Sequence, residues 1–387
     1  KQINKMKTMT TTNEKLLDFQ TKISNSKIFV KDFNLSQLNI ESIEGMNYIN
    51  IKDGNNVTKL FHASIQAVSS LSKMLNIENL FSNLSGSVGK EQASKILQVI
   101  KVALSKNNKS VRLILNFETK TVENIIEKAP DYLSNDSFLK LFESKLDANS
   151  EIINYGVGQD GTQSVTFKSE NWGFKLAGKT DESFNMGMLF ENSPVRGTSV
   201  MPYFYRLVCT NGMVAGRGID SMSLTLEGRK EADVLKFIQG VNALNFNSYD
   251  ASEFGNRVTF MEKTRASLRE IKSFKNLIIK KSNISNKDID EKMVLNSQLE
   301  DFFPTNSIEQ LYFKKGYDLE SLTMKHYANI KSEITAWDLL NNLTDFASHD
   351  YGFNVSQSDM IKLQGQAGEY MSKKSFDTEF LMPQLIK

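Results

Sequence analysis

The sequence predicts an α+β fold, in which a central antiparallel β-meander is flanked by N-terminal helices and by a mostly helical C-terminal half. Three observations predict it. Apolar residues recur at helical spacing before residue 106, short apolar runs broken by glycine fill residues 152–226, and helical spacing returns after Gly228. We expect three parts: an N-terminal helical region (1–105), an α+β core with an antiparallel sheet and an arginine-rich helix (106–281), and an acidic helical region with an apolar C-terminal tail (282–387).

Two helices are predicted in the N-terminal part, over residues 57–84 and 90–105. In the second, Ile96, Ile100 and Leu104 fall on one apolar face, because they are four residues apart. The next predicted elements are a strand over 110–117 and helices over 121–129 and 137–146, the last with Ser137 as its N-cap.

Glycine-containing turns punctuate the central part. The pairs Asp160-Gly161 and Asn211-Gly212 each predict a two-residue hairpin turn, in which both central positions need positive φ. Between and after them, short strands up to Leu226 complete the predicted meander. The pairs Gly156-x-Gly158 and Gly216-x-Gly218 fit hairpins and bulges better than a phosphate-binding loop, because no helix is expected to follow.

The C-terminal half is predicted to be helical, with a long helix over residues 253–281. Further helices are expected over 230–244, 308–317, 322–328 and 336–347. In the last of these, Trp337, Leu340, Leu343 and Phe346 recur at helical spacing and indicate core or a subunit contact. The apolar tail, with Phe376, Phe380 and Leu381, is expected to dock on another surface.

Composition limits the chemistry. The chain has 387 residues, 40% hydrophobic and 24% charged, with a formal net charge of +2, which is typical of a folded globular protein. The single cysteine, Cys209, excludes an intramolecular disulfide and favours a reducing compartment. Three histidines leave little room for a zinc site, and no phosphate loop or long apolar run is present. We therefore expect no metal, no cofactor and no membrane association.

The charges are unevenly distributed. Residues 196–281 carry 14 basic and 8 acidic residues, whereas residues 282–387 carry 10 basic and 16 acidic ones. Seven of the eight arginines lie between positions 196 and 269, interleaved with aromatic residues. Single-stranded nucleic acid is held by cations along its phosphates and by aromatic rings that stack on its bases. The predicted nucleic-acid-binding residues are Arg196, Arg206, Arg217, Arg257, Arg265, Arg269, Lys272 and Tyr249.

A plainer interpretation of the same segment stays open. Arg265, Arg269 and Lys272 share one face of the predicted long helix, where Glu262 and Glu270 could pair with them as on any solvated helix. The aromatic residues could simply belong to the core.

Two stretches resemble a known family. The first runs from Tyr205 through Arg206, Cys209, Asn211 and Gly212 to Val214, and the second from Thr335 through Trp337 and Thr344 to His349. Together, in this order and separation, they resemble the phage- and plasmid-type "domain of unknown function 932" family, over roughly residues 110–350. The resemblance implies a mobile genetic element, the cytoplasm of a bacterial host and a neighbourhood concerned with DNA. It implies no catalytic residue.

Two further residues have a chemical and a structural interpretation. Cys209 could be a nucleophile with His349 as its base, but its place after an apolar pair favours a buried, inert thiol. His349 is expected to satisfy carbonyls at a helix end.

The favoured function is therefore an oligomeric phage-type nucleic-acid-binding protein that handles single-stranded DNA in replication or recombination. The alternative is a self-assembling structural or virion-associated protein. We do not expect an enzyme, and no catalytic residue is assigned.

Overall fold

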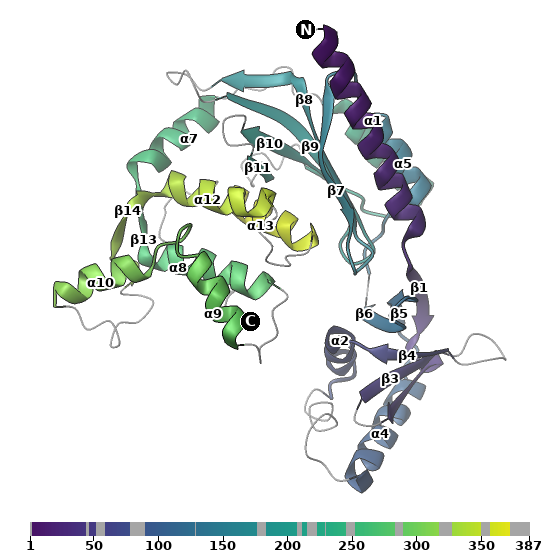
Figure 1. The fold of residues 1–387 in the computed structure, drawn as a ribbon. Helices are drawn as coiled ribbons and strands as arrows, with labels where there is room; N and C mark the ends of the chain where they lie inside the picture. The colour runs from purple at the N-terminus through teal and green to yellow at the C-terminus, as the bar shows by residue number, and fades with distance from the viewer. Residues whose placement is uncertain are drawn as a thin grey trace.

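The computed structural model describes residues 2–43, 46–51, 59–77, 90–127, 129–175, 183–206, 211–214, 223–228, 230–244, 252–282, 289–316, 327–349 and 357–371. Figure 1 shows an N-terminal sheet with two helices, a long curved sheet, and a group of helices beneath its arch. The α+β fold class is confirmed.

The sequence predicted a helical N-terminal part, but the structure has both helices and strands there. After the helix α1 (Gln2–Asn25) come four strands: β1 (Ile28–Asn34), β2 (Leu38–Ile43), β3 (Met46–Ile51) and β4 (Lys59–Ala63). The helix expected over 57–84 is therefore wrong at its start, and α2 (Ile65–Leu75) begins only after the N-cap Ser64. These segments form strands because buried and less buried residues alternate along them with period two. In β2, for example, Leu38 and Ile40 are buried. The helix expected over 90–105 is confirmed as α4 (Lys90–Ser105).

A second correction concerns residues 121–129. They form the strand β6 (Thr121–Glu127), which pairs antiparallel with β5 (Ser110–Asn116). The register shifts by one residue at Glu123, so that Val122 and Ile125 both face the core. This bulge turns the strand period of two into a spacing of three, which imitates a helix. The following helix α5 (Asn135–Glu143) is confirmed, but its N-cap is Ser134 and not Ser137.

The first sheet has the strand order β1-β5-β6-β4-β3-β2 and must curl. Its edge strands β1 and β2 are joined by the 3-10 turn Leu35–Gln37 alone. In a flat sheet, five inter-strand spacings would separate the edges by about 24 Å. The four Cα steps from Asn34 to Leu38 span about 14 Å at most. The edges therefore approach each other at this turn. Helices α2 and α4 pack on the apolar face, through Leu71 and Ile100 among others.

The second sheet is the expected antiparallel meander. Its strands are β7 (Ser150–Val157), β8 (Gln163–Lys175), β9 (Ser183–Ser193), β10 (Gly197–Arg206) and β11 (Asn211–Val214), in the order β11-β10-β9-β8-β7, with β12 (Leu224–Thr225) paired to β10. One face is apolar and includes Phe167, Phe190 and Phe204; it packs against α5 and α1. The Thr12 hydroxyl and the Lys15 amino group, both of α1, donate to backbone carbonyls of β7.

The two hairpin pairs do not form the expected turns. Gly161 has φ +76°, but Asp160 has no positive φ, and residues 158–162 form a longer loop. Asn211 and Gly212 are strand residues of β11, paired with Arg206 and Tyr205 of β10. Residues 207–210, with Cys209, lie outside the described residues.

The C-terminal half is helical, but the long helix expected over 253–281 is broken. Its parts are α7 (Ser252–Lys263), the short strand β13 (Arg265–Ser267) and α8 (Leu268–Lys281). Ser267 caps α8 reciprocally with Glu270, and β13 pairs with β14 (Lys331–Thr335), so that capping and pairing together end the helix. The other helices are α6 (Glu231–Ala243), α9 (Ile289–Gln298), α10 (Asn306–Lys314), α12 (Ala336–Ser348) and α13 (Gln357–Met371).

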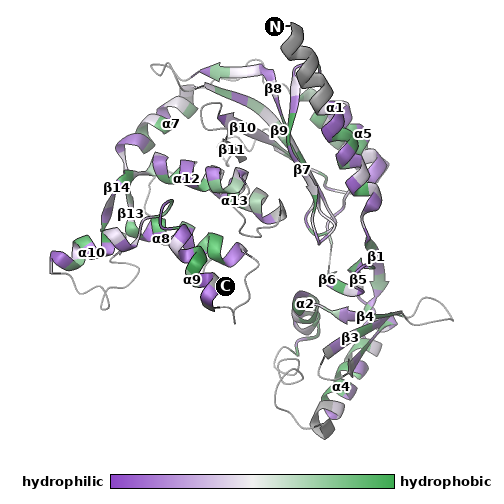
Figure 2. Ribbon diagram, in the orientation of Figure 1, coloured by the Kyte–Doolittle hydropathy of each residue, from purple (hydrophilic) through white to green (hydrophobic). Residues whose placement is uncertain are grey.

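Helix α12 has the buried stripe that its spacing predicts. Trp337, Leu340, Leu343 and Phe346 are all buried, which confirms the expected core helix. Together α12 and α13 contact β11 beneath the arch of the second sheet (Figure 1). In Figure 2, α4 and α12 each carry hydrophobic and hydrophilic residues, as amphipathic helices do. Residues 372–387, with the expected apolar tail, lie outside the described part, as do residues 317–326.

Arg112 of β5 joins the first sheet to the second. Its side chain is 2% exposed. Its Nε donates to Asp32 Oδ1 at 2.9 Å, and its Nη1 donates to the carbonyl oxygens of Pro130, at 2.7 Å, and Pro194, at 3.1 Å. The guanidinium also lies 4.9 Å from the ring centre of Tyr132. A single side chain thus connects β1, the chain before α5 and the turn after β9.

We expect Arg112→Met to destabilise the protein by roughly 1–3 kcal/mol, because three acceptors lose a donor. The loss stays below that of a fully buried ion pair, since Asp32 keeps contact with water. Urea unfolding measures it. Lys109→Met, which breaks a surface pair with Glu127, is the control and should cost less than about 1 kcal/mol. Equal midpoints for Arg112→Met and wild type would contradict the connecting role.

Candidate nucleic-acid interface

The expected arginine site is divided by the length of β10. Arg196 lies in the turn before this strand and Arg206 is its last residue. At about 3.3 Å per residue the two are roughly 30 Å apart. Arg196 binds Glu191 at 2.8 Å and Asp160 at 3.7 Å. Burial acts to lower the pKa of Arg196, but these carboxylates outweigh it and raise that pKa.

Arg206 and Arg265 both lie beside the start of α12. The Arg206 guanidinium is 5.5 Å from the ring centre of Trp337. Arg265 pairs with Thr335 in the β13–β14 ladder, and its Nη1 donates to the Ser332 carbonyl at 3.3 Å. Arg206 and Arg265 thus contact neighbouring residues at the start of α12, Trp337 for Arg206 and Thr335 for Arg265.

Arg257 of α7 is directed toward the end of α13. Its Nε donates to the carbonyl oxygen of Met371 at 2.5 Å, and its guanidinium lies 5.3 Å from the ring centre of Phe260. Burial lowers the pKa of Arg257.

The expected cationic face of one long helix does not exist. Arg265 belongs to β13, whereas Arg269 and Lys272 belong to α8, and Arg269 is buried. Lys272 pairs with Glu309 and lies 4.3 Å from the ring centre of Tyr327.

The cations of α8 are neutralised from within the chain. Lys272 pairs with Glu309, Lys275 with Glu300, and Lys281 with Asp359. Each pair joins the basic segment 196–281 to the acidic segment 282–387. At these positions, the uneven charge distribution of the sequence therefore produces ion pairs between two segments of the same chain.

The aromatic residues of the arginine segment are mostly core. Tyr203, Phe204, Phe237 and Phe254 are buried, and Phe260 is the described one with an exposed ring. Burial raises the pKa of Tyr203. Arg217 and Tyr249, the remaining expected binding residues, lie outside the described part of the chain.

His349 follows the structural interpretation. It is the C-cap of α12, and both its backbone N–H, at 3.1 Å, and its Nδ1, at 3.0 Å, lie next to the carbonyl oxygen of Asp345. A helix-end role is therefore confirmed.

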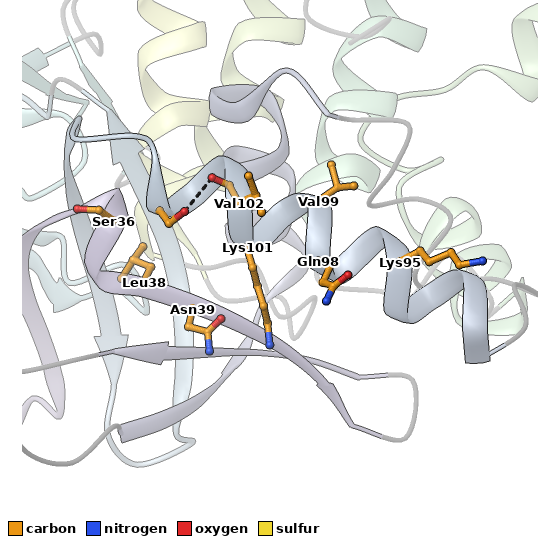
Figure 3. A pocket seen from close by; sticks show the side chains of 9 residues that line it. Ser36, Leu38, Asn39, Lys95, Gln98, Val99, Lys101 and Val102 are labelled. Carbon is orange, nitrogen blue, oxygen red and sulfur yellow. Dashed lines mark hydrogen bonds between the residues drawn. The ribbon is translucent and has the colours of Figure 1, made fainter.

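Sequence reasoning missed a groove on the N-terminal part. It has a volume of about 790 Å³ and lies between α4 and the start of β2. Its lining residues are Ser36, Leu38, Asn39, Lys95, Gln98, Val99, Lys101, Val102 and Ser105. Figure 3 shows Lys101 and Asn39 on the same side of the groove, with Lys95 at the far end of the helix segment. The lining thus consists of amines, amides, hydroxyls and an apolar strip, without a carboxylate.

Both charged side chains among the described lining residues of the groove, Lys95 and Lys101, are basic. Residues 92–117 contain five basic residues and no acidic one, a signal that was available in the sequence. Two of the five pair elsewhere, Lys109 with Glu127 and Arg112 with Asp32. Lys101 and Lys106 are exposed and make no ion pair with any described residue. Val99 and Val102, 52% and 50% exposed, complete the groove-facing side of α4.

No described helix is long and apolar enough to cross a membrane. In the same residues, no group of three or more His, Cys, Asp or Glu side chains is placed to hold a metal ion.

Comparison with known proteins identifies one family. Residues 195–366 match the model described as Domain of unknown function (DUF932). The match confirms the expected resemblance and includes both motif stretches, but it starts later than the expected residue 110 and leaves the α4 groove outside. No curated protein and no solved structure matches the chain.

The pairing of Lys275 with Glu300 makes stability depend on pH. Glu300 also accepts from the backbone N–H groups of Thr305 and Asn306 at the start of α10. Burial acts to raise the pKa of Glu300, but Lys275 and these N–H groups outweigh it and lower that pKa below 4.5. The stabilisation is therefore complete above pH 4.5 and lost as the pH falls through the lowered pKa.

We expect Glu300→Gln to lower the free energy of unfolding at pH 7 and to lose this difference from wild type at pH values well below 4.5. Urea unfolding across this pH range measures the effect. Glu118→Gln, a change at an exposed carboxylate, should follow wild type at every pH. A deficit of Glu300→Gln that stays constant with pH would contradict the charge-based role.

Proposed function

We propose that this chain, with a domain of unknown function 932 over residues 195–366, is a nucleic-acid-binding protein that handles single-stranded DNA in replication or recombination of a phage-type element. The proposal includes an oligomeric state, the cytoplasm of a bacterial host, and a binding rather than a catalytic role. The observation that carries it is the α4 groove, where lysines and amides line a concave surface with no carboxylate among its described lining residues.

The chemistry of the groove favours a polyanion. Lys95 and Lys101 of α4 and Lys106, directly after this helix, are exposed, and each amine can neutralise a phosphate and release a counterion. Asn39 and Gln98 add hydrogen-bond donors and acceptors that do not depend on charge. A helix with cations on its exposed side and no carboxylate in the groove beside it provides an attractive potential for phosphates.

The arginine segment supports the proposal less strongly. Arg196 and Arg257 bind groups of the protein itself, and Arg269 is buried. Arg265 is exposed and pairs with Thr335, and Arg206 lies next to Trp337, so these two form a second, smaller contact at the start of α12 in the proposal.

The self-assembly alternative has its own supporting observation. Helices α9 and α10 expose Met293, Val294, Leu311 and Phe313, the last at 70%. Exposed apolar side chains of this size are typical of subunit contacts when they are covered in an oligomer.

We expect the protein to bind single-stranded DNA with an affinity that falls steeply with salt. The triple variant Lys95→Gln, Lys101→Gln, Lys106→Gln should flatten the slope of log K against log salt by about two units, since single strands give about 0.7 per phosphate contact. Fluorescence anisotropy with a labelled oligonucleotide at several salt concentrations measures both quantities.

The matched control changes the same net charge elsewhere. Lys140, Lys236 and Lys314 are exposed lysines of α5, α6 and α10, and their exchange for Gln should leave the slope unchanged. An equal loss in both triples would indicate a global charge effect and no groove site. No binding at low salt to single-stranded DNA, double-stranded DNA or RNA would contradict the proposed function.

For the alternative, we expect Leu311→Ser with Phe313→Ser to lower the sedimentation coefficient if these residues lie in a subunit contact. Leu235→Ser, at an exposed position on α6, should leave sedimentation unchanged. Sedimentation velocity with and without single-stranded DNA separates the two functions: assembly that ignores DNA favours the structural role, and an unchanged coefficient in the double variant contradicts this contact.

A further inference from the structure

A small aromatic pocket opens next to the lysine-lined groove. It has a volume of about 190 Å³ and is lined by residues from β1, β3, β4 and β5 and by Phe117, which follows β5. Four of its eight lining residues are phenylalanines: Phe29, Phe33, Phe61 and Phe117. Its volume is below the roughly 300–1,000 Å³ of sites for whole small-molecule ligands, so it suits a single ring system.

The rings at its mouth are in contact and partly exposed. The ring centres of Phe29 and Phe117 lie 4.6 Å apart, and those of Phe61 and Phe117 lie 5.2 Å apart, both edge to face. Phe61 is buried and holds the cluster, whereas Phe29 and Phe117 are 54% and 37% exposed. The fold thus leaves two large apolar rings partly exposed to water at this pocket.

The pocket and the groove flank the same turn. Phe33 lines the pocket and Ser36, three residues later, lines the groove. Ile51 lines the pocket, and its cross-strand partner Leu38 lines the groove. Phe33 and Ser36 are about 10 Å apart at most. Phe29 lies seven residues before Ser36, about 23 Å along an extended chain, so the ligand that reaches from the rings to the groove must be a strand of several units. The curl of the sheet, which brings its edges together at this turn, creates the adjacency.

The charge of the pocket matches that of the groove. Among the described lining residues, the one ionisable group is the amine of Lys31, which is exposed and lies 5.1 Å from the ring centre of Phe33. A cation beside aromatic rings is the combination that binds a base and its phosphate together.

We propose that the Phe29–Phe117 pocket takes one unstacked nucleobase of a single strand whose phosphates lie along α4. This inference rests on the proposed function and adds a base-binding site to its phosphate contacts. A duplex cannot use this site, since its bases are stacked on one another and are not available to the rings.

The test uses the full chain and an oligo(dT) strand. The double variant Phe29→Leu, Phe117→Leu keeps apolar bulk but removes both rings, and it should lower the affinity for the strand between about 5-fold and 150-fold. The salt slope should not change, because no phosphate contact is lost. Affinity for a duplex of equal length should also stay the same. Leu235→Ala, which removes an exposed apolar side chain on α6, is the control and should bind as wild type does.

The outcomes separate the inference from the function on which it rests. If the double variant binds oligo(dT) as wild type does while the lysine triple still flattens the slope, the base pocket is overturned and the nucleic-acid function stands. A double variant that loses self-association but keeps its affinity for the strand overturns it too, because a second copy of the chain is then the occupant. A loss of duplex and single-strand affinity in equal proportion overturns base binding, and melting curves show whether the fold has been lost. Absence of any binding by the wild-type chain removes both proposals.

Discussion

The buried guanidinium of Arg112 connects the first sheet to the second, and the placement of the groove and the pocket depends on this connection. It joins Asp32 on β1 to the carbonyl oxygens of Pro130 and Pro194, so three separate segments meet at one planar cation. A lysine could not replace it, because an ammonium lacks the fixed fork of donors that meets three acceptors at once. Arg112 is also the one arginine outside the segment 196–269, and its task is structural. The curled first sheet, with its groove and pocket, is held next to the second sheet through this contact.

Electrostatic complementarity within the chain changes the interpretation of its charge distribution. The basic segment and the acidic segment meet in the pairs of Lys272, Lys275 and Lys281, so much of the positive charge near α8 is used to fix α9, α10 and α13 in place. Exposed lysines without a carboxylate among the described lining residues lie instead in the α4 groove, outside the segment that matches the family model. In the proposed function, the family segment is thus chiefly the scaffold, and the curled N-terminal sheet carries the ligand.

The fold was predictable where local signals agreed. The glycine-broken runs gave the second sheet, and the spacing of Trp337 and its neighbours gave α12. Prediction failed where a contact between residues far apart in the sequence determined the local structure. A bulge at Glu123 imitated helical spacing, and the pairing of β13 with a strand about 65 residues later, together with the Ser267 cap, interrupted an otherwise continuous helical pattern. The α4 groove depends on η1 and β2 as well as on the helix, so its lysine run could be read from the sequence but its concave shape could not.

The docking of α1 on β7 has a consequence for how the chain folds during synthesis. The hydroxyl of Thr12 reaches the carbonyl of Ser150, 138 residues later. At about 5–20 residues per second, the ribosome needs roughly 7–30 s to make that partner. During this time Phe19 and Ile23, which end up buried, have no sheet to cover them. An isolated helix is also marginal in water. The nascent chain must therefore carry an uncovered apolar segment while 138 of its 387 residues are made, which makes α1 the natural point of engagement for a chaperone.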